Sequence, residues 1–176
     1  MNIDTTRQYC AICSAEVDMP VDTIDAMAMA PGEIGGALRA SLSGSGAGWS
    51  HGALRASLSG SGAGWSPAEV LTHLADTEVV TGWRLRQILA EDEPTIQPYD
   101  QERWATALHY QKRDPTVALE AFGAARHANL EILRLLSDEE WERTYVQPEY
   151  GRQTLRTKIR HISDHDLAHL RQIRGG

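Results

Sequence analysis

Hydrophobic side chains recur at helical spacing through most of the chain, and helix-capping signals separate the helical stretches. A first helix is expected over about residues 21–42, with Pro31-Gly32 bending or splitting it. The clearest signal is Ser66-Pro67-Ala68-Glu69, a capping box with proline at the first helical position. Leucine, isoleucine and valine side chains follow it at helical spacing, so the second helix is expected to continue to about Ala90.

Two more long helices are predicted in the second half of the chain. The third opens at Asp114-Pro115 and runs to about Leu136, and the fourth spans about residues 154–173. A short amphipathic piece is expected over about residues 100–110, and a helical turn around Trp141. The alternation typical of a strand is found nowhere, so no strand is predicted. The pattern predicts an all-α four-helix bundle, with loops after the second and third helices long enough for crossover connections.

One segment of fifteen residues occurs twice. Residues 36–50 and residues 52–66 both read GALRASLSGSGAGWS, with His51 between them. Each copy ends in a run of Ser and Gly that does not continue a helix. One copy is therefore expected to form a loop or insertion within a single domain over residues 21–176, preceded by an N-terminal tail over residues 1–20.

Composition narrows the classes of protein that the chain can belong to. The chain has 24 Asp and Glu residues against 17 Lys and Arg, a formal charge of −7. Because a nucleic-acid-binding protein presents a basic face, this charge weighs against nucleic-acid binding. Cys10 and Cys13 form one C-x-x-C in the predicted tail, without a second ligand pair at zinc-ribbon spacing, so two reduced thiols are expected. No membrane span and no signal-peptide pattern is seen, and a cytoplasmic protein is expected.

The histidines carry the candidate chemistry. His165 and His169 are four residues apart in the predicted fourth helix, the spacing at which two imidazoles can share one metal. At about 100° per residue, both lie on or beside the face defined by Ile162, and His161 is more lateral. In the second helix, His73 flanks the apolar face. Three neutral imidazoles on a divalent metal leave positions open for water, as in catalytic sites.

Two further polar residues of the fourth helix are candidates for a supporting role. Asp166 falls on the apolar stripe, where a buried carboxylate needs a partner. It either orients an imidazole or pairs with a neighbouring Arg, and the sequence does not choose between them. Gln172 projects close to the His165 side and is a candidate pocket residue. Without a metal, the two helical histidines are hydrogen-bonded flanking residues.

Two motifs resemble those of the DinB/YfiT-like superfamily of helical metalloproteins. They are Trp65-Ser-Pro-Ala-Glu-Val-Leu-Thr-His73-Leu and His165-Asp-Leu-Ala-His169-Leu-Arg-Gln172-Ile. Pro148-Glu-Tyr-Gly151-Arg-Gln-Thr-Leu155 and Tyr99-Asp-Gln-Glu-Arg-Trp104 also look like family segments. The resemblance covers roughly residues 65–173 and departs from the family at the duplication.

The resemblance implies a four-helix bundle with zinc or nickel held by His73, His165 and His169. It implies a metal-dependent enzyme acting on a small molecule, either a transferase that uses a low-molecular-weight thiol or a hydrolase, with thiol transfer slightly favoured. The alternatives are a non-catalytic metal- or ligand-binding bundle of a stress response, and a structural dimer with an empty site. A homodimer is expected, because small bundles often pair through partly apolar outer faces.

Overall fold

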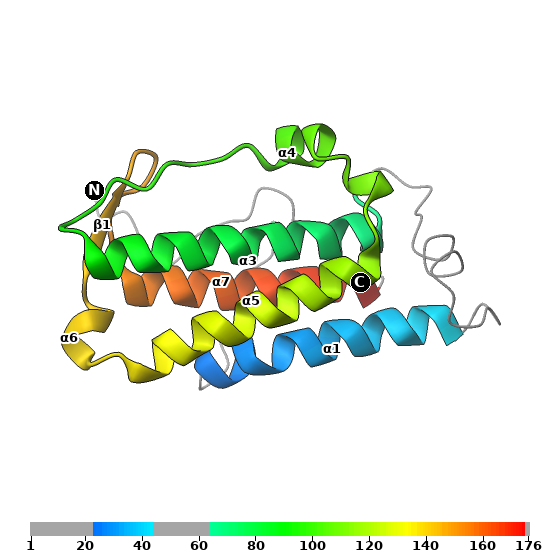
Figure 1. Ribbon diagram of the computed structural model, residues 1–176, viewed down its shortest axis with the longest axis horizontal. Helices are drawn as coiled ribbons and strands as arrows, with labels where there is room; N and C mark the ends of the chain where they lie inside the picture. Colours follow the sequence, from blue (N-terminus) through cyan, green and yellow to red (C-terminus); the bar gives the residue numbers. More distant parts are fainter. Residues whose placement is uncertain (1–22, 44–63, 175–176) are drawn as a thin grey trace, which may run out of the picture.

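Four long helices build the part of the chain that the computed structural model describes, residues 23–43 and 64–174 (Figure 1). They are α1 (Thr23–Ser43), α3 (Pro67–Ala90), α5 (Pro115–Leu135) and α7 (Leu155–Arg174). Helix α3 packs against α5 and α7, and α1 packs against the same two helices. After α3 the chain returns along the length of the bundle before α5 begins, as Figure 1 shows. The structure thus confirms the predicted all-α four-helix bundle.

Short elements fill the connections. The long return after α3 contains α4 (Gln101–Ala107) and the 3₁₀ turn η1 (Tyr110–Lys112). Helix α6 (Asp138–Trp141) follows α5 and leads into strands β1 (Thr144–Gln147) and β2 (Gly151–Thr154). The last of these runs directly into α7.

The antiparallel β1–β2 hairpin corrects the expectation that the chain has no strand. Each strand has only four residues, too few for a recognisable alternation of polar and apolar positions. The hairpin forms because Tyr145 of β1 is buried in the core and because Val146 also forms a parallel bridge with Thr95. Gly151, at φ 71°, supplies the left-handed backbone conformation at the start of β2.

Helix α1 continues through Pro31 as one helix of 21 residues, so the proline does not split it. A proline inside a helix removes one backbone hydrogen bond and crowds the preceding turn. Met27 before the proline and Ile34 after it are both buried in the core. Burial of side chains on both sides of Pro31 holds the two halves in one helix against that cost.

The duplication is described only at its two ends. Residues 36–43 of the first copy belong to α1, and residues 64–66 of the second copy lead into α3. Ser66 caps α3 as predicted: its side chain accepts from the backbone of Glu69, whose carboxylate accepts from the Ser66 backbone. The rest of both copies and the tail over residues 1–20, with Cys10 and Cys13, lie outside the described residues, so those expectations stay predictions.

The core is apolar at both ends of the bundle and carries a charged cluster between its helices. Arg126 of α5 is 1% exposed and forms ion pairs with Glu78 of α3 at 2.7 Å and Asp166 of α7 at 2.6 Å. The same guanidinium donates to the backbone oxygen of Met27 in α1, at 3.0 Å. One side chain therefore connects all four long helices.

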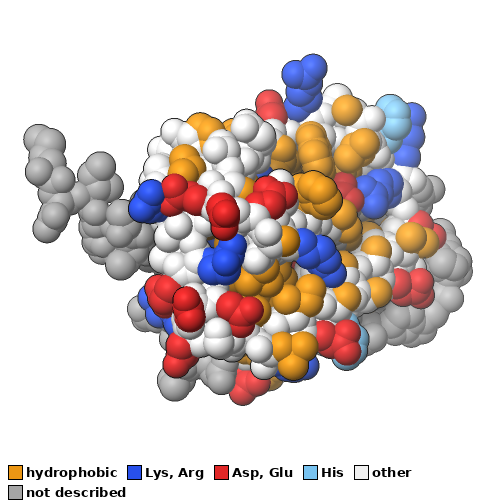
Figure 2. Space-filling view, turned by 60° about the vertical axis from the view of Figure 1, so that its left-hand side comes forward, with side chains coloured by type: hydrophobic (Ala, Val, Ile, Leu, Met, Phe, Trp, Pro, Cys, Tyr) orange, Lys and Arg blue, Asp and Glu red, His pale blue; other side chains and the backbone are white. Residues whose placement is uncertain are grey.

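The outer surface is mixed in charge. Figure 2 shows acidic and basic side chains interspersed with hydrophobic ones over the face that it presents. Among the described residues, no helix is both long enough and apolar enough to span a bilayer.

Candidate metal centre

Three histidines from two helices meet inside the bundle. His73 lies in α3, seven residues after its cap at Ser66, and His165 and His169 lie one turn apart in α7. Their exposed fractions are 1%, 7% and 0%. The three imidazoles that the sequence singled out are thus brought together in the bundle interior.

The same nitrogen of each ring faces the others. The Nε2 atom of His165 lies 3.1 Å from Nε2 of His73 and 3.1 Å from Nε2 of His169. All three ligand atoms lie within 4.8 Å of one another. Two imidazole nitrogens bound to one tetrahedral zinc lie about 3.3 Å apart, given zinc–nitrogen distances of about 2.0–2.1 Å. The two 3.1 Å separations to His165 therefore fit a shared metal ion.

Gln172 fixes the orientation of one of these rings. Its Oε1 atom lies 2.8 Å from Nδ1 of His169. A carbonyl oxygen only accepts, so Nδ1 carries the proton and Nε2 presents its lone pair to the other imidazoles. Such a hydrogen bond to the remote nitrogen is the usual support of a histidine ligand. The structure places Gln172 beside the cluster, whereas the two cavities described below are lined by other residues.

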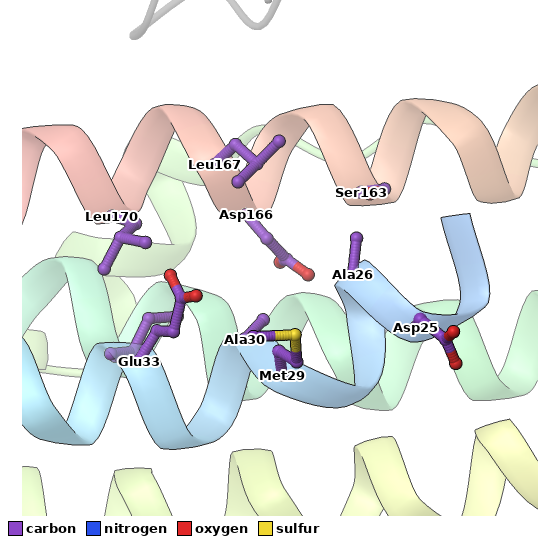
Figure 3. A pocket seen from close by; sticks show the side chains of 10 residues that line it. Asp25, Ala26, Met29, Ala30, Glu33, Ser163, Asp166, Leu167 and Leu170 are labelled. Carbon is purple, nitrogen blue, oxygen red and sulfur yellow. The ribbon is translucent and has the colours of Figure 1, made fainter. Parts of the chain in front are cut away.

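Asp166 lies on another side of α7. Its carboxylate pairs with Arg126, and no hydrogen bond between Asp166 and an imidazole is found among the described residues. It lines a separate cavity of about 340 Å³ between α1 and α7, where it projects from α7 near Met29 and Leu170 (Figure 3). Of the two roles left open by the sequence, the structure shows the pairing with an Arg.

A second cavity, of about 220 Å³, reaches the histidine cluster from outside. His73 and His165 line it, and so does His161, which is only partly buried. A pair of hydroxyl groups stands beside the cluster: Thr77 Oγ1 lies 3.4 Å from Nε2 of His73 and 3.0 Å from the hydroxyl of Tyr99. The cluster is thus open to a small molecule on a side that also offers hydroxyl groups.

The wall of this cavity contains two cationic side chains that the sequence-based prediction of the site did not include. Lys158 of α7 and Arg84 of α3 both line it, and Lys158 is 6% exposed. Their positions around the helix axes could have identified them. At about 100° per residue, Lys158 lies roughly 20° from His165 around the axis of α7, and Arg84 lies roughly 20° from His73 around the axis of α3. Each cation therefore shares a helix face with one of the cluster histidines, and a search for all polar residues on those faces would have found both.

A four-helix bundle with three converging imidazoles at the buried end of an open cavity defines a class: helical bundles built around a candidate metal centre. The comparison with known families agrees. The model of the DinB superfamily matches residues 28–173, and the chain belongs to this family.

Relatives and a solved structure extend this finding. The protein OB0782 of Oceanobacillus iheyensis, provisionally named a metal-dependent hydrolase, is 32% identical over 105 residues. YfiT of Bacillus subtilis, provisionally named in the same way, is 28% identical over 81 residues. These matches cover 60% and 46% of this chain and the same shares of the two relatives. The solved structure of Bacillus subtilis YfiT, a four-helix bundle, superposes with a TM-score of 0.71 over 92% of this chain and 90% of its own, at 20% identity.

Proposed function

We propose that this protein is a metal-dependent hydrolase of small molecules, with zinc or nickel held by His73, His165 and His169. The observation that carries the proposal is the convergence of three buried Nε2 atoms at the end of an open cavity. The provisional names of the relatives point to the same class of reaction. Three protein ligands with room for another group are the pattern of catalytic rather than structural zinc sites.

The residues around the cluster have distinct tasks in this proposal. A divalent metal held there supplies Lewis acidity, which makes water a nucleophile at neutral pH and polarises the bond to be cleaved. Gln172 keeps the proton of His169 on Nδ1, away from the cluster. Thr77 and Tyr99 present hydroxyl groups beside His73 that can hydrogen-bond to the attacking water or to the substrate. The bundle core keeps bulk water away from the other sides of the cluster.

Elemental analysis of the chain purified without a His tag tests the metal centre. We expect about one divalent ion per chain after incubation with zinc or nickel, because three neutral imidazoles match both metals. His169→Ala should abolish uptake. His161→Ala is the matched control: it removes a histidine of the same helix that lies outside the cluster and should leave uptake unchanged. Wild-type protein that takes up neither metal would refute the centre.

Turnover assays separate hydrolysis from the other chemistry that the family resemblance implies. Metal-loaded protein is offered a panel of small esters, amides and phosphate esters, and separately a low-molecular-weight thiol with a chlorinated aromatic. Hydrolysis that is lost on metal removal and in His169→Ala supports the proposal. Metal-dependent thiol transfer without hydrolysis would replace it with the transferase. Metal uptake without either activity would leave a binding protein.

A further inference from the structure

We propose that Lys158, Arg84 and His161 form a subsite for an oxyanion, so that the substrate is a small molecule bearing a carboxylate or phosphate group. This inference rests on the proposed function, because it assigns the substrate of that site. Its basis is the wall of the 220 Å³ cavity, which brings these three side chains from two helices to one opening.

The position of Lys158 is the first argument. Its side chain is 6% exposed and lines the cavity, and its ammonium lies 5.7 Å from the centre of the Tyr145 ring. Among the described residues, no carboxylate lies within ion-pair distance of it. A buried ammonium without a counter-charge is costly, and buried lysines are ordinarily paired. No side chain among the described residues therefore supplies a negative charge to pair with Lys158.

A second cation beside the first makes the case for a ligand stronger. Arg84 stacks near Tyr99, at 5.5 Å from the ring centre, and donates to the backbone oxygen of Gln97. Burial lowers the pKa of Lys158 to about 7, and the positive charge of Arg84 contributes in the same direction. The protein keeps two cations close to each other at a cost that a bound oxyanion would remove.

The other ionisable groups around the cavity do not balance these cations. Glu149, in the turn of the hairpin, is the one acidic side chain among the described residues that line it, and it is exposed. Tyr99 and Tyr150 line the opening with phenol rings, and His161 adds an imidazole. The Tyr145 ring that faces Lys158 is buried in the core. A planar guanidinium and an ammonium together match carboxylate or phosphate oxygens. With the histidine cluster at the inner end, the ligand would place its anionic group near Lys158 and its reacting bond near the cluster.

The chain offers an unusually clean probe, because Lys112 and Lys158 are its only two lysines. Protein grown with lysine labelled with ¹³C at the ε carbon gives one NMR signal for each, assigned with Lys158→Met and Lys112→Met. Metal-free protein is titrated with succinate and with inorganic phosphate at constant ionic strength in chloride. Succinamide, neutral and of the same length as succinate, is the control ligand. The titrations are then repeated on zinc-loaded protein.

We expect at least one of the two anions to shift the Lys158 signal saturably and to leave that of Lys112 unmoved, and succinamide to shift neither. Arg84→Met should weaken the affinity by about tenfold, the loss of one charge-assisted contact. Arg134→Met, which removes an exposed arginine of α5 outside the cavity, should not change it. Calorimetry on Lys158→Met should show anion binding lost.

Three results would overturn the subsite. They are a Lys158 signal that neither anion moves with or without zinc, an equal response to succinamide, and a response that Arg84→Met leaves intact. A shift seen only with zinc supports the proposal if Arg84→Met weakens it and otherwise reports an anion on the metal. Metal uptake is measured on the same samples. Anion binding without metal uptake would refute the proposed hydrolase alone, and metal uptake without anion binding would refute the subsite alone.

Discussion

Replacing Lys158 with methionine should make the stability of this protein less dependent on pH. Burial of the Lys158 ammonium, and after it the nearby charge of Arg84, lower the pKa of this group from 10.5 to about 7 in the folded protein. In the unfolded chain the pKa returns to its ordinary value, so between pH 7 and pH 10.5 the unfolded state holds a proton that the folded state has lost. Stability therefore rises with pH in this window, and the full cost of burying the charge is present below pH 7.

The expected magnitude follows from those two values. Between pH 7 and pH 9, the Lys158 linkage should add about 2 kcal/mol to the free energy of unfolding. Lys158→Met removes this contribution, and it should also be more stable than the wild type at pH 7 because methionine buries no charge. The measurement is urea unfolding of metal-free protein at pH 7, 8 and 9 in chloride buffers free of carboxylate and phosphate.

A matched variant separates this linkage from all other titrations. Lys112 is exposed in η1, so Lys112→Met should follow the wild-type pH dependence. The quantity that decides is the wild-type change in unfolding free energy from pH 7 to pH 9 minus that of Lys158→Met. If the two proteins change in parallel, Lys158 keeps its charge up to pH 9 in the folded state, and the argument that it lacks a counter-charge is wrong.

Three other predictions follow from single contacts. Arg126→Met should destabilise the fold by about 3–5 kcal/mol, because it leaves two buried carboxylates without their ion-pair partner. Arg156→Met, which removes an exposed ion pair, should cost at most about 1 kcal/mol. Urea unfolding of both variants measures the two free energies. Gly82→Ala should destabilise the fold by about 1–3 kcal/mol, because its Cβ would lie 2.6 Å from a buried amide oxygen of α5. Gly123→Ala, with open space around its Cβ, should stabilise the fold by about 0.5–1 kcal/mol. In thermal unfolding, the first variant should therefore lower the Tm and the second should raise it. Gln172→Leu should weaken metal affinity about 10–100-fold with the fold intact, as measured by competition with a chelator.

Local signals in the sequence determine most of the fold. The Ser66 capping box and the Asp114-Pro115 start lie where α3 and α5 begin, because each satisfies the free backbone donors of a first turn. The β1–β2 hairpin could not be predicted in this way. It depends on Tyr145 reaching the core and on a bridge to Thr95, about fifty residues earlier in the chain. Contacts so distant in sequence leave no periodic pattern.

In the site, too, local patterns could be predicted from the sequence and long-range contacts could not. The spacing of His165 and His169 identifies a helix face, whereas their meeting with His73 depends on how α3 packs against α7. Asp166 shows the limit most clearly. Rotation placed it correctly on the buried side of α7, but the choice between an imidazole and an arginine partner required the position of Arg126 on α5.

The charged cluster around Arg126 has a consequence for the site as well as for stability. Arg126 pairs with Glu78, five residues after His73 in α3, and with Asp166, between the two cluster histidines of α7. Buried pairs of this kind require good geometry, so they restrict how α3 and α7 slide or rotate against each other. The imidazoles from those two helices meet within 3.1 Å only if that register is kept. Arg126 thus acts as a positioning residue for the histidine cluster. Arg126→Lys keeps one charge but not two fixed contacts. This variant should lose more free energy of metal binding, measured by competition with a chelator, than free energy of unfolding, measured in urea.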